Sequence, residues 1–113
     1  MGRFPRQSEV WDVELDPVRG REQAGTRPAL VISKDGFNSS PSRLCVVAPI
    51  TSTRRGFMAH VQIDPPEGGL TTPSSILCDQ IRTVSLDRLR RPRGNVEATT
   101  LETVIRMLHR IVG

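Results

Sequence analysis

The sequence has 113 residues and a formal net charge of +4, and only one of its 16 basic residues is a lysine. A chain of this length is expected to form one domain over residues 1–113, with residues 1–7 as a frayed N-terminal extension. It lacks the ~20 consecutive apolar residues of a membrane span and the apolar core of a signal peptide, which predicts a cytoplasmic protein without membrane contact. The positive charge favours an anionic partner such as nucleic acid, although an ordinary basic surface gives the same charge.

The first three-quarters of the chain carry the patterns of short β-strands. Apolar and polar residues alternate over 10–15, with Trp11, Val13 and Leu15 on the expected core face. Three runs, over 28–33, 44–50 and 74–79, are apolar throughout or nearly so, as expected of strands covered on both faces. Alternation returns over 60–64. Segments rich in Gly, Pro, Ser and Asp separate these strands, over 16–25, 36–42 and 64–73. Five or more short strands at this spacing predict a compact antiparallel barrel or curled sheet.

The end of the chain changes to helical spacing. The apolar residues that follow this period are Leu101, Val104, Ile105, Leu108, Ile111 and Val112. Thr99 and Glu102 ahead of them match a capping box at the start of a helix. We expect one amphipathic helix that packs on the sheet, with a dimer seam as the alternative use of its apolar stripe.

The cysteines and histidines give no sign of a metal centre or cofactor site. Cys45 and Cys78 each lie within an apolar run, and neither forms a CxxC pair. His60 and His109 are not spaced as partners in a metal site. We therefore expect two buried, reduced thiols, no metal and no cofactor.

Arg27 stands out as a cation with a rigid base. It follows a polar loop over 22–26 and precedes Pro28, which fixes its own φ and biases Arg27 towards extended backbone geometry. A permanently charged fork of five N–H donors held in this way suits a phosphate group. Arg19 and Arg21 lie in the loop that leads to it.

The sequence lacks the usual catalytic patterns. No histidine lies beside a serine or cysteine, and neither an HExxH motif nor a phosphate-binding GxxxxGK[ST] loop is present. An enzyme built from this inventory must use cations, hydroxyls and a carboxylate. RNA cleavage fits these groups, because the ribose 2′-OH is itself the nucleophile and the protein need only position it and neutralise developing charge.

Three segments, at 15–28 (LDPVRGREQAGTRP), 48–53 (APITST) and 77–83 (LCDQIRT), resemble the MazF/PemK family of toxin ribonucleases. The resemblance implies a mainly β fold with a C-terminal α-helix, the small SH3-like barrel of the MazF/PemK/CcdB type, assembled as a homodimer. It also implies metal-independent, sequence-preferring cleavage of single-stranded RNA to a 2′,3′-cyclic phosphate and a 5′-OH. Translation would be inhibited, and a cognate MazE-like antitoxin with an acidic C-terminal tail would neutralise the toxin. The alternative is a non-catalytic module of the same fold, either a gyrase poison or an RNA-binding domain.

The same resemblance implies the catalytic residues. Arg27 matches the family's catalytic arginine and Thr51 the threonine on which cleavage depends. Glu22 is the carboxylate nearest to Arg27 in sequence, and it would either orient the guanidinium or act as general base. Orientation is the favoured role, because an adjacent arginine makes a carboxylate a weaker base. For Thr51 the alternative is a hydroxyl that only bonds the local backbone. Arg21 replaces the serine that is usual in the family.

A further set is expected to contact RNA. Arg54 and Arg55 would bind backbone phosphates, and Phe57 would stack on a base or simply anchor its loop. Arg82 would face the same groove or pair with Asp79. The complete predicted RNA-binding set is Arg19, Arg21, Thr53, Arg54, Arg55, Phe57, Gln80 and Arg82. Arg88, Arg90, Arg91 and Arg93 are expected to form a solvated basic loop, which either has no specific role or adds diffuse attraction for RNA.

Overall fold

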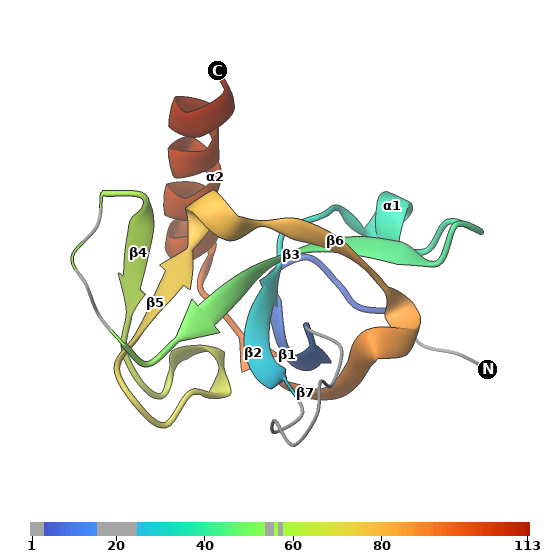
Figure 1. Cartoon of the computed structure of the whole chain (residues 1–113), viewed down its shortest axis with the longest axis horizontal. Coiled ribbons are helices and arrows are strands. Elements are labelled where there is room, and N and C mark those ends of the chain that lie inside the picture. The colour runs from blue at the N-terminus through green and yellow to red at the C-terminus, as the bar shows by residue number, and fades with distance from the viewer. Residues whose placement is uncertain (1–3, 16–24, 54–55, 57) are drawn as a thin grey trace.

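A computed structural model describes residues 4–15, 25–53, 56 and 58–113 of the chain (Figure 1). Short 3₁₀ turns separate the strands from β4 onwards, and a single long helix ends the chain. The strands are β1 (Glu9–Glu14), β2 (Thr26–Val31), β3 (Leu44–Thr51), β4 (His60–Ile63), β5 (Ser74–Leu77), β6 (Arg82–Ser85) and β7 (Leu89–Asn95). The helices and turns are α1 (Asp35–Asn38), η1 (Glu67–Gly69), η2 (Cys78–Gln80), η3 (Leu86–Arg88) and α2 (Ala98–Val112).

All strand pairs in this sheet are antiparallel. The order β4-β5-β3-β2-β1-β7 forms one path, and β6 pairs with β3 beside it. The long strand β3 therefore serves two neighbours on one edge, β6 along its first half and β5 at its last two residues. In Figure 1 the strands curl around the core of the domain, and α2 stands beside β4, which it contacts together with η2. The predicted mainly β fold with a C-terminal helix is confirmed.

Two apolar clusters lie on the two faces of the sheet, which explains the continuous apolar runs in the sequence. Along β2, Leu30 belongs to the cluster that packs against α2, whereas Ala29 and Val31 belong to the other cluster. Both clusters also draw residues from β3. Val13 and Leu15 are buried and Trp11 packs beside them, as the alternation in β1 predicted. The two central strands thus bury side chains on both faces.

The predicted basic loop between residues 88 and 93 is wrong, because most of this segment forms β7. Its arginines pair with carboxylates on the neighbouring strand β1: Arg90 with Glu14, and both Arg91 and Arg93 with Asp12, at 3.5 and 3.0 Å. Two register shifts interrupt the pairing of β1 with β7. Charge pairing across these strands takes the place of the apolar runs and alternation that marked the predicted strands, so the sequence pattern did not reveal β7.

The predicted helix is present as α2, but its N-terminus is capped differently from the expectation. The N-cap residue is Glu97, which makes no side-chain cap, so the predicted capping box of Thr99 and Glu102 is wrong. Instead, the carboxylate of Glu67 in η1 accepts hydrogen bonds from the Glu97 N–H at 2.8 Å and from the Thr100 hydroxyl. A distant carboxylate thereby satisfies the helix terminus and joins it to η1.

Only part of the apolar stripe of α2 packs on the sheet. Val104 is fully buried, and Leu101, Met107 and Leu108 pack around the same cluster. At the end of the helix, Ile111 and Val112 remain 46% and 81% exposed. The expected packing of the helix on the sheet is therefore confirmed for most of α2, and the apolar side chains of its last turn remain exposed. In the described part of the chain, no helix is both long and apolar enough to cross a membrane.

Two glycines bring η1 into direct contact with the backbone of β7. Gly69 has a φ of 69°, and a Cβ placed on it would lie 2.1 Å from the carbonyl oxygen of Arg93. A Cβ on Gly94 would lie 2.8 Å from the Gly69 nitrogen. No side chain fits at either contact, so the close approach of η1 and β7 depends on glycine at both positions.

Residues 4–7, expected to be frayed, are held against the domain. The Gln7 side chain donates to the Ile32 carbonyl at 2.8 Å, and the Gln7 N–H donates to Asp35. The buried Asn38 amide donates to the Pro5 carbonyl. These contacts are long-range in sequence, which is why composition alone suggested a loose end.

Candidate functional site

Two adjoining hollows on the surface share the residues Arg27, Thr51 and Thr53. The larger, of about 510 Å³, is here called the hydroxyl lobe, and its lining comprises Arg27, Pro28, Ile50, Thr51, Ser52, Thr53, Leu70, Thr71, Thr72, Ser74 and Arg93. The smaller, of about 230 Å³, is called the histidine lobe and is lined by Arg27, Thr51, Thr53, His60, Leu77, Asp79 and Gln80. Arg27 and Thr51 thus lie where the two lobes meet.

The strand register explains how residues 24 positions apart in sequence come together. Ala29 pairs with Pro49 at the end of the β2–β3 ladder. Continuing that register by two residues sets Arg27 opposite Thr51, and opposed residues of antiparallel strands present their side chains on the same face. Arg27 itself lies within β2, opposite Val13 of β1. The ladder between β2 and β3 stops short of Arg27, and the lobes lie in that space.

The hydroxyl of Thr51 is already oriented by the chain. Its oxygen accepts a hydrogen bond from the Thr53 N–H at 3.2 Å, and the Thr51 backbone pairs with Ser75 in β5. The local backbone contact proposed as the alternative role of Thr51 is therefore present. Because this contact uses only an acceptor position, the O–H of Thr51 is left to donate to a bound group.

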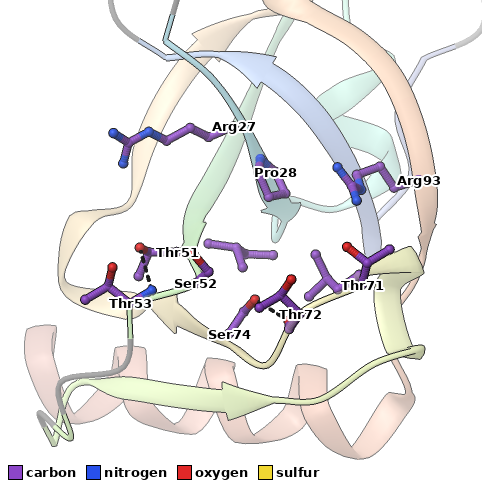
Figure 2. A pocket seen from close by; sticks show the side chains of 11 residues that line it. Arg27, Pro28, Thr51, Ser52, Thr53, Thr71, Thr72, Ser74 and Arg93 are labelled. Atoms are coloured by element: carbon purple, nitrogen blue, oxygen red, sulfur yellow. Dashed lines mark hydrogen bonds between the residues drawn. The ribbon is translucent and has the colours of Figure 1, made fainter.

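The hydroxyl lobe combines positive charge with hydroxyl groups. Figure 2 shows Arg27 and Arg93 on opposite sides of Pro28, with the hydroxyls of Thr51, Thr53 and Thr72 in the same hollow. Among its described lining residues, none is acidic. Two guanidinium groups and several neutral donors without a facing carboxylate form a site for an anion with several oxygens.

The histidine lobe contains an imidazole and a carboxylate. His60 Nε2 lies 3.3 Å from Asp79 Oδ1, and the His60 side chain is 4% exposed while that of Asp79 is 42% exposed. His60 begins β4 opposite Leu77, which brings it next to η2 and Asp79. The sequence did not predict His60 as a site residue, because its neighbour Asp79 is 19 positions away and only the β4–β5 pairing joins them.

The structure brings together four of the predicted site residues: Arg27, Thr51, Thr53 and Gln80 all line one or both lobes. Arg82 does not join them, since it lies exposed on β6, where it pairs with Val47, and lines neither lobe. Asp79 contacts His60. The remaining predicted residues lie outside the described part of the chain, namely Glu22, Arg19, Arg21, Arg54, Arg55 and Phe57.

Neither cysteine supplies a nucleophile to the site. Both are buried and free, as predicted. Burial raises the pKa of the Cys45 thiol to about 11, and burial together with the charge of Asp79 raises the pKa of Cys78 to about 11. Both thiols are therefore protonated at neutral pH and unreactive. In the part of the chain that the structure describes, no three His, Cys, Asp or Glu side chains are grouped as metal ligands.

Comparison with known proteins gives consistent matches in sequence and structure. A family model described as "PemK-like, MazF-like toxin of type II toxin-antitoxin system" matches residues 6–112. "Endoribonuclease MazF9" of Mycobacterium tuberculosis is 37% identical over 101 residues, which cover 85% of this chain and 86% of that protein. A crystal structure of MazF from Deinococcus radiodurans superposes with a TM-score of 0.83 at 26% identity and covers 99% of both chains. A mycobacterial endoribonuclease in complex with its cognate antitoxin superposes with a TM-score of 0.78 at 26% identity, covering 96% of this chain and 95% of that one.

Proposed function

The chain belongs to the family of PemK-like, MazF-like toxins of type II toxin–antitoxin systems, and we propose that it is a metal-independent endoribonuclease that cuts single-stranded RNA at preferred sequences. The observation that carries this proposal is the meeting of Arg27 and Thr51 at the junction of the two lobes. These are the residues that the family resemblance implies for cleavage. The relatives named endoribonuclease support the same class of reaction.

The proposed reaction is a transesterification within the RNA. The 2′-oxygen attacks the adjacent phosphorus, a new P–O bond forms to that oxygen, and the bond from phosphorus to the 5′-oxygen of the next nucleotide breaks. The 2′-OH loses a proton and the leaving 5′-oxygen gains one. The products are a 2′,3′-cyclic phosphate and a 5′-OH. No oxidant or external nucleophile is needed, so positioning and charge neutralisation are the main tasks of the protein.

Each residue proposed to act in cleavage has an assigned task. The Arg27 guanidinium binds the non-bridging phosphate oxygens and neutralises the charge that develops on them. The Thr51 hydroxyl, oriented by the Thr53 N–H, donates to the phosphate or to the 2′-oxygen. Glu22 orients Arg27 or accepts the proton of the 2′-OH. Because the His60 side chain is buried, we assign it to holding the Asp79 carboxylate in place and not to direct contact with the RNA.

The remaining polar residues of the site are proposed to hold the RNA strand. Thr53 and Gln80 line the lobes beside the junction. Arg19, Arg21, Arg54 and Arg55 would contribute positive charge along the strand, and Phe57 a stacking surface. Contacts to phosphate carry no base information, so sequence preference would arise from the members of this set that contact bases, such as Phe57.

The proposed biological role is a cytoplasmic toxin that inhibits translation by cutting RNA and is neutralised by a MazE-like antitoxin. The antitoxin-bound mycobacterial structure supports this type of partner. A homodimer is proposed as the assembly. The exposed apolar residues Ile81, Ile111 and Val112 support contact with another chain, because large apolar side chains gain stability when they are buried in an interface.

The function is tested with purified protein and a mixed-sequence single-stranded RNA in excess EDTA. Discrete cuts with cyclic phosphate ends are expected from the natural protein. Thr51→Val should slow cleavage roughly ten- to hundredfold with little change in RNA affinity, because it deletes one hydrogen bond to a charged group. Thr51→Ser is the matched control and should keep most of the activity. RNA retention without any cuts would identify a binding module instead, and a parallel fall in affinity would make Thr51 a binding residue.

A second test concerns the antitoxin. An acidic, extended peptide imitates the charge of RNA. It is therefore expected to occupy the two lobes where the RNA would bind, and to order on binding. A non-cleavable RNA should therefore compete with the antitoxin's acidic tail in a titration that follows both ligands. If both ligands saturate the protein together without loss of affinity, inhibition does not act by occupation of the groove.

A further inference from the structure

Arg93 forms the wall of the hydroxyl lobe that lies across from Arg27. It comes from β7, a strand that the arginine-rich sequence did not predict, and its guanidinium lies on the side of Pro28 that faces away from Arg27 (Figure 2). Its side chain is 23% exposed, far less than the 74% of Arg91 two residues earlier on the same strand. Arg93 is therefore a fixed component of the lobe.

Two contacts hold the guanidinium of Arg93 in place. One terminal nitrogen donates to Asp12 Oδ1 at 3.0 Å, and the other donates to the Gly69 carbonyl at 3.4 Å. The backbone of Arg93 is fixed as well, because Gly69 and Gly94 bring η1 into direct contact with it. A side chain that is held at both ends loses little conformational entropy when it binds a ligand.

Carboxylates lie near Arg93 on the η1 side, where it also borders a hollow lined by Asp64, Glu67 and Glu97, but its face in the hydroxyl lobe has no acidic neighbour among the described lining residues. Asp12 is one carboxylate shared between two guanidiniums, those of Arg91 and Arg93. The two recorded contacts of Arg93 use two of the five N–H donors of its guanidinium. On the lobe side, its neighbours among the described residues are the hydroxyl-bearing Thr71 and Thr72. The guanidinium attracts an anion, and the two hydroxyls can donate hydrogen bonds to its oxygens.

We propose that Arg93, together with Thr71 and Thr72, forms a subsite for a second phosphodiester of the bound RNA, beside the scissile one held by Arg27 and Thr51. This inference rests on the proposed function. The hydroxyl lobe extends continuously from Arg27 to Arg93, so a strand whose scissile phosphate sits at the junction has a neighbouring phosphate within the same hollow. The subsite would fix the register of the strand relative to Thr51.

Arg91 provides a matched control for this proposal. It has the same charge, lies on the same strand and pairs with the same carboxylate, yet it does not line the hydroxyl lobe. Arg93→Gln is expected to weaken binding of a non-cleavable RNA by about tenfold or more, the range for a hydrogen-bonded ionic contact. It should also lower the salt dependence of binding by a slope of roughly 0.7. Arg91→Gln should change neither by a comparable amount. Arg93→Lys keeps the charge but lacks the planar fork, so its affinity for the RNA should lie between those of the natural protein and Arg93→Gln.

Chemical substitution of the RNA separates a phosphate contact from a structural role. Single phosphates of the non-cleavable RNA are replaced one at a time by neutral methylphosphonates. In the natural protein and in Arg91→Gln, neutralising one particular non-scissile phosphate should weaken binding, and in Arg93→Gln that loss should disappear. If the two variants behave alike, or if every methylphosphonate has the same effect in both, Arg93 is only a structural partner of Asp12. If the natural protein neither binds nor cuts RNA, the proposed function fails and the subsite with it.

Discussion

Replacing Arg27 with alanine is expected to lower the rate of RNA cleavage by about two to three powers of ten, the range for deleting one donor to a developing negative charge. Folding should be nearly unaffected. Arg27 is exposed, and among the described residues its guanidinium takes part in no ion pair that stabilises the sheet. Arg27→Lys should recover only part of the rate, because lysine keeps the charge but lacks two parallel N–H donors.

The measurement is a single-turnover cleavage rate together with a thermal unfolding curve for each variant. Arg110→Ala is a suitable control, since Arg110 is an exposed arginine near the end of α2 and lines neither lobe. It removes the same charge from the protein without touching the site. Full activity in a correctly folded Arg27→Ala variant would remove Arg27 from the reaction and leave Thr51 without its proposed partner.

The largest effect on stability is expected from Gly69→Ala. The new Cβ would lie 2.1 Å from the Arg93 carbonyl oxygen, which is backbone and cannot swing aside. The φ of 69° adds the strain of a left-handed conformation. We expect the free energy of unfolding to fall by about 3 kcal/mol or more, and the Tm by more than about 10 °C.

Two other glycines separate the causes of that loss. Gly56 has a φ of 70° with open space around it, so Gly56→Ala should cost only the backbone strain, about 1–2 kcal/mol. Gly36 lies in α1, also in open space and without a positive φ, so Gly36→Ala should not destabilise. Chemical denaturation of the three variants gives the comparison. A Gly69→Ala variant no less stable than Gly56→Ala would show that η1 and β7 can move apart at little cost.

The elements that the sequence predicted correctly are those in which buried apolar residues recur at strand or helix spacing. The strands that contain Val13, Leu30 and Val47 were recognisable because the residues that fill the two apolar clusters recur at strand spacing. The helix was recognisable for the same reason, by its own period. What failed were features fixed by polar contacts between distant segments, such as the cap that Glu67 provides to α2. Local pattern contains no information about a partner 30 residues away.

The candidate site shows the same division. Arg27 and Thr51 were assigned from short motifs, and the strand register accounts for their meeting. His60 and Arg93 had no comparable signal, because their places in the two lobes depend on how β4 and β7 pair within the sheet. Arg93 was hidden among neighbouring arginines whose side chains remain exposed. The role of a residue in this cleft depends on the side of the cleft that it lines. That position is set by strand pairing and cannot be read from the local sequence.

The turn η1 has a consequence that extends beyond its three residues. Through Glu67 it caps the first turn of α2, and through Gly69 it braces the strand that bears Arg93. Arg27 and Thr51, by contrast, pair with strands that do not contact η1 through Gly69, Arg27 with β1 and Thr51 with β5. A local opening of η1 would therefore release the start of the helix and the Arg93 wall as one cooperative unit, while the opposite wall stays in place. The side of the cleft that carries Arg27 and Thr51 therefore does not rest on the Gly69 contact, whereas the position of the side that carries Arg93 depends on the same turn as the start of the C-terminal helix.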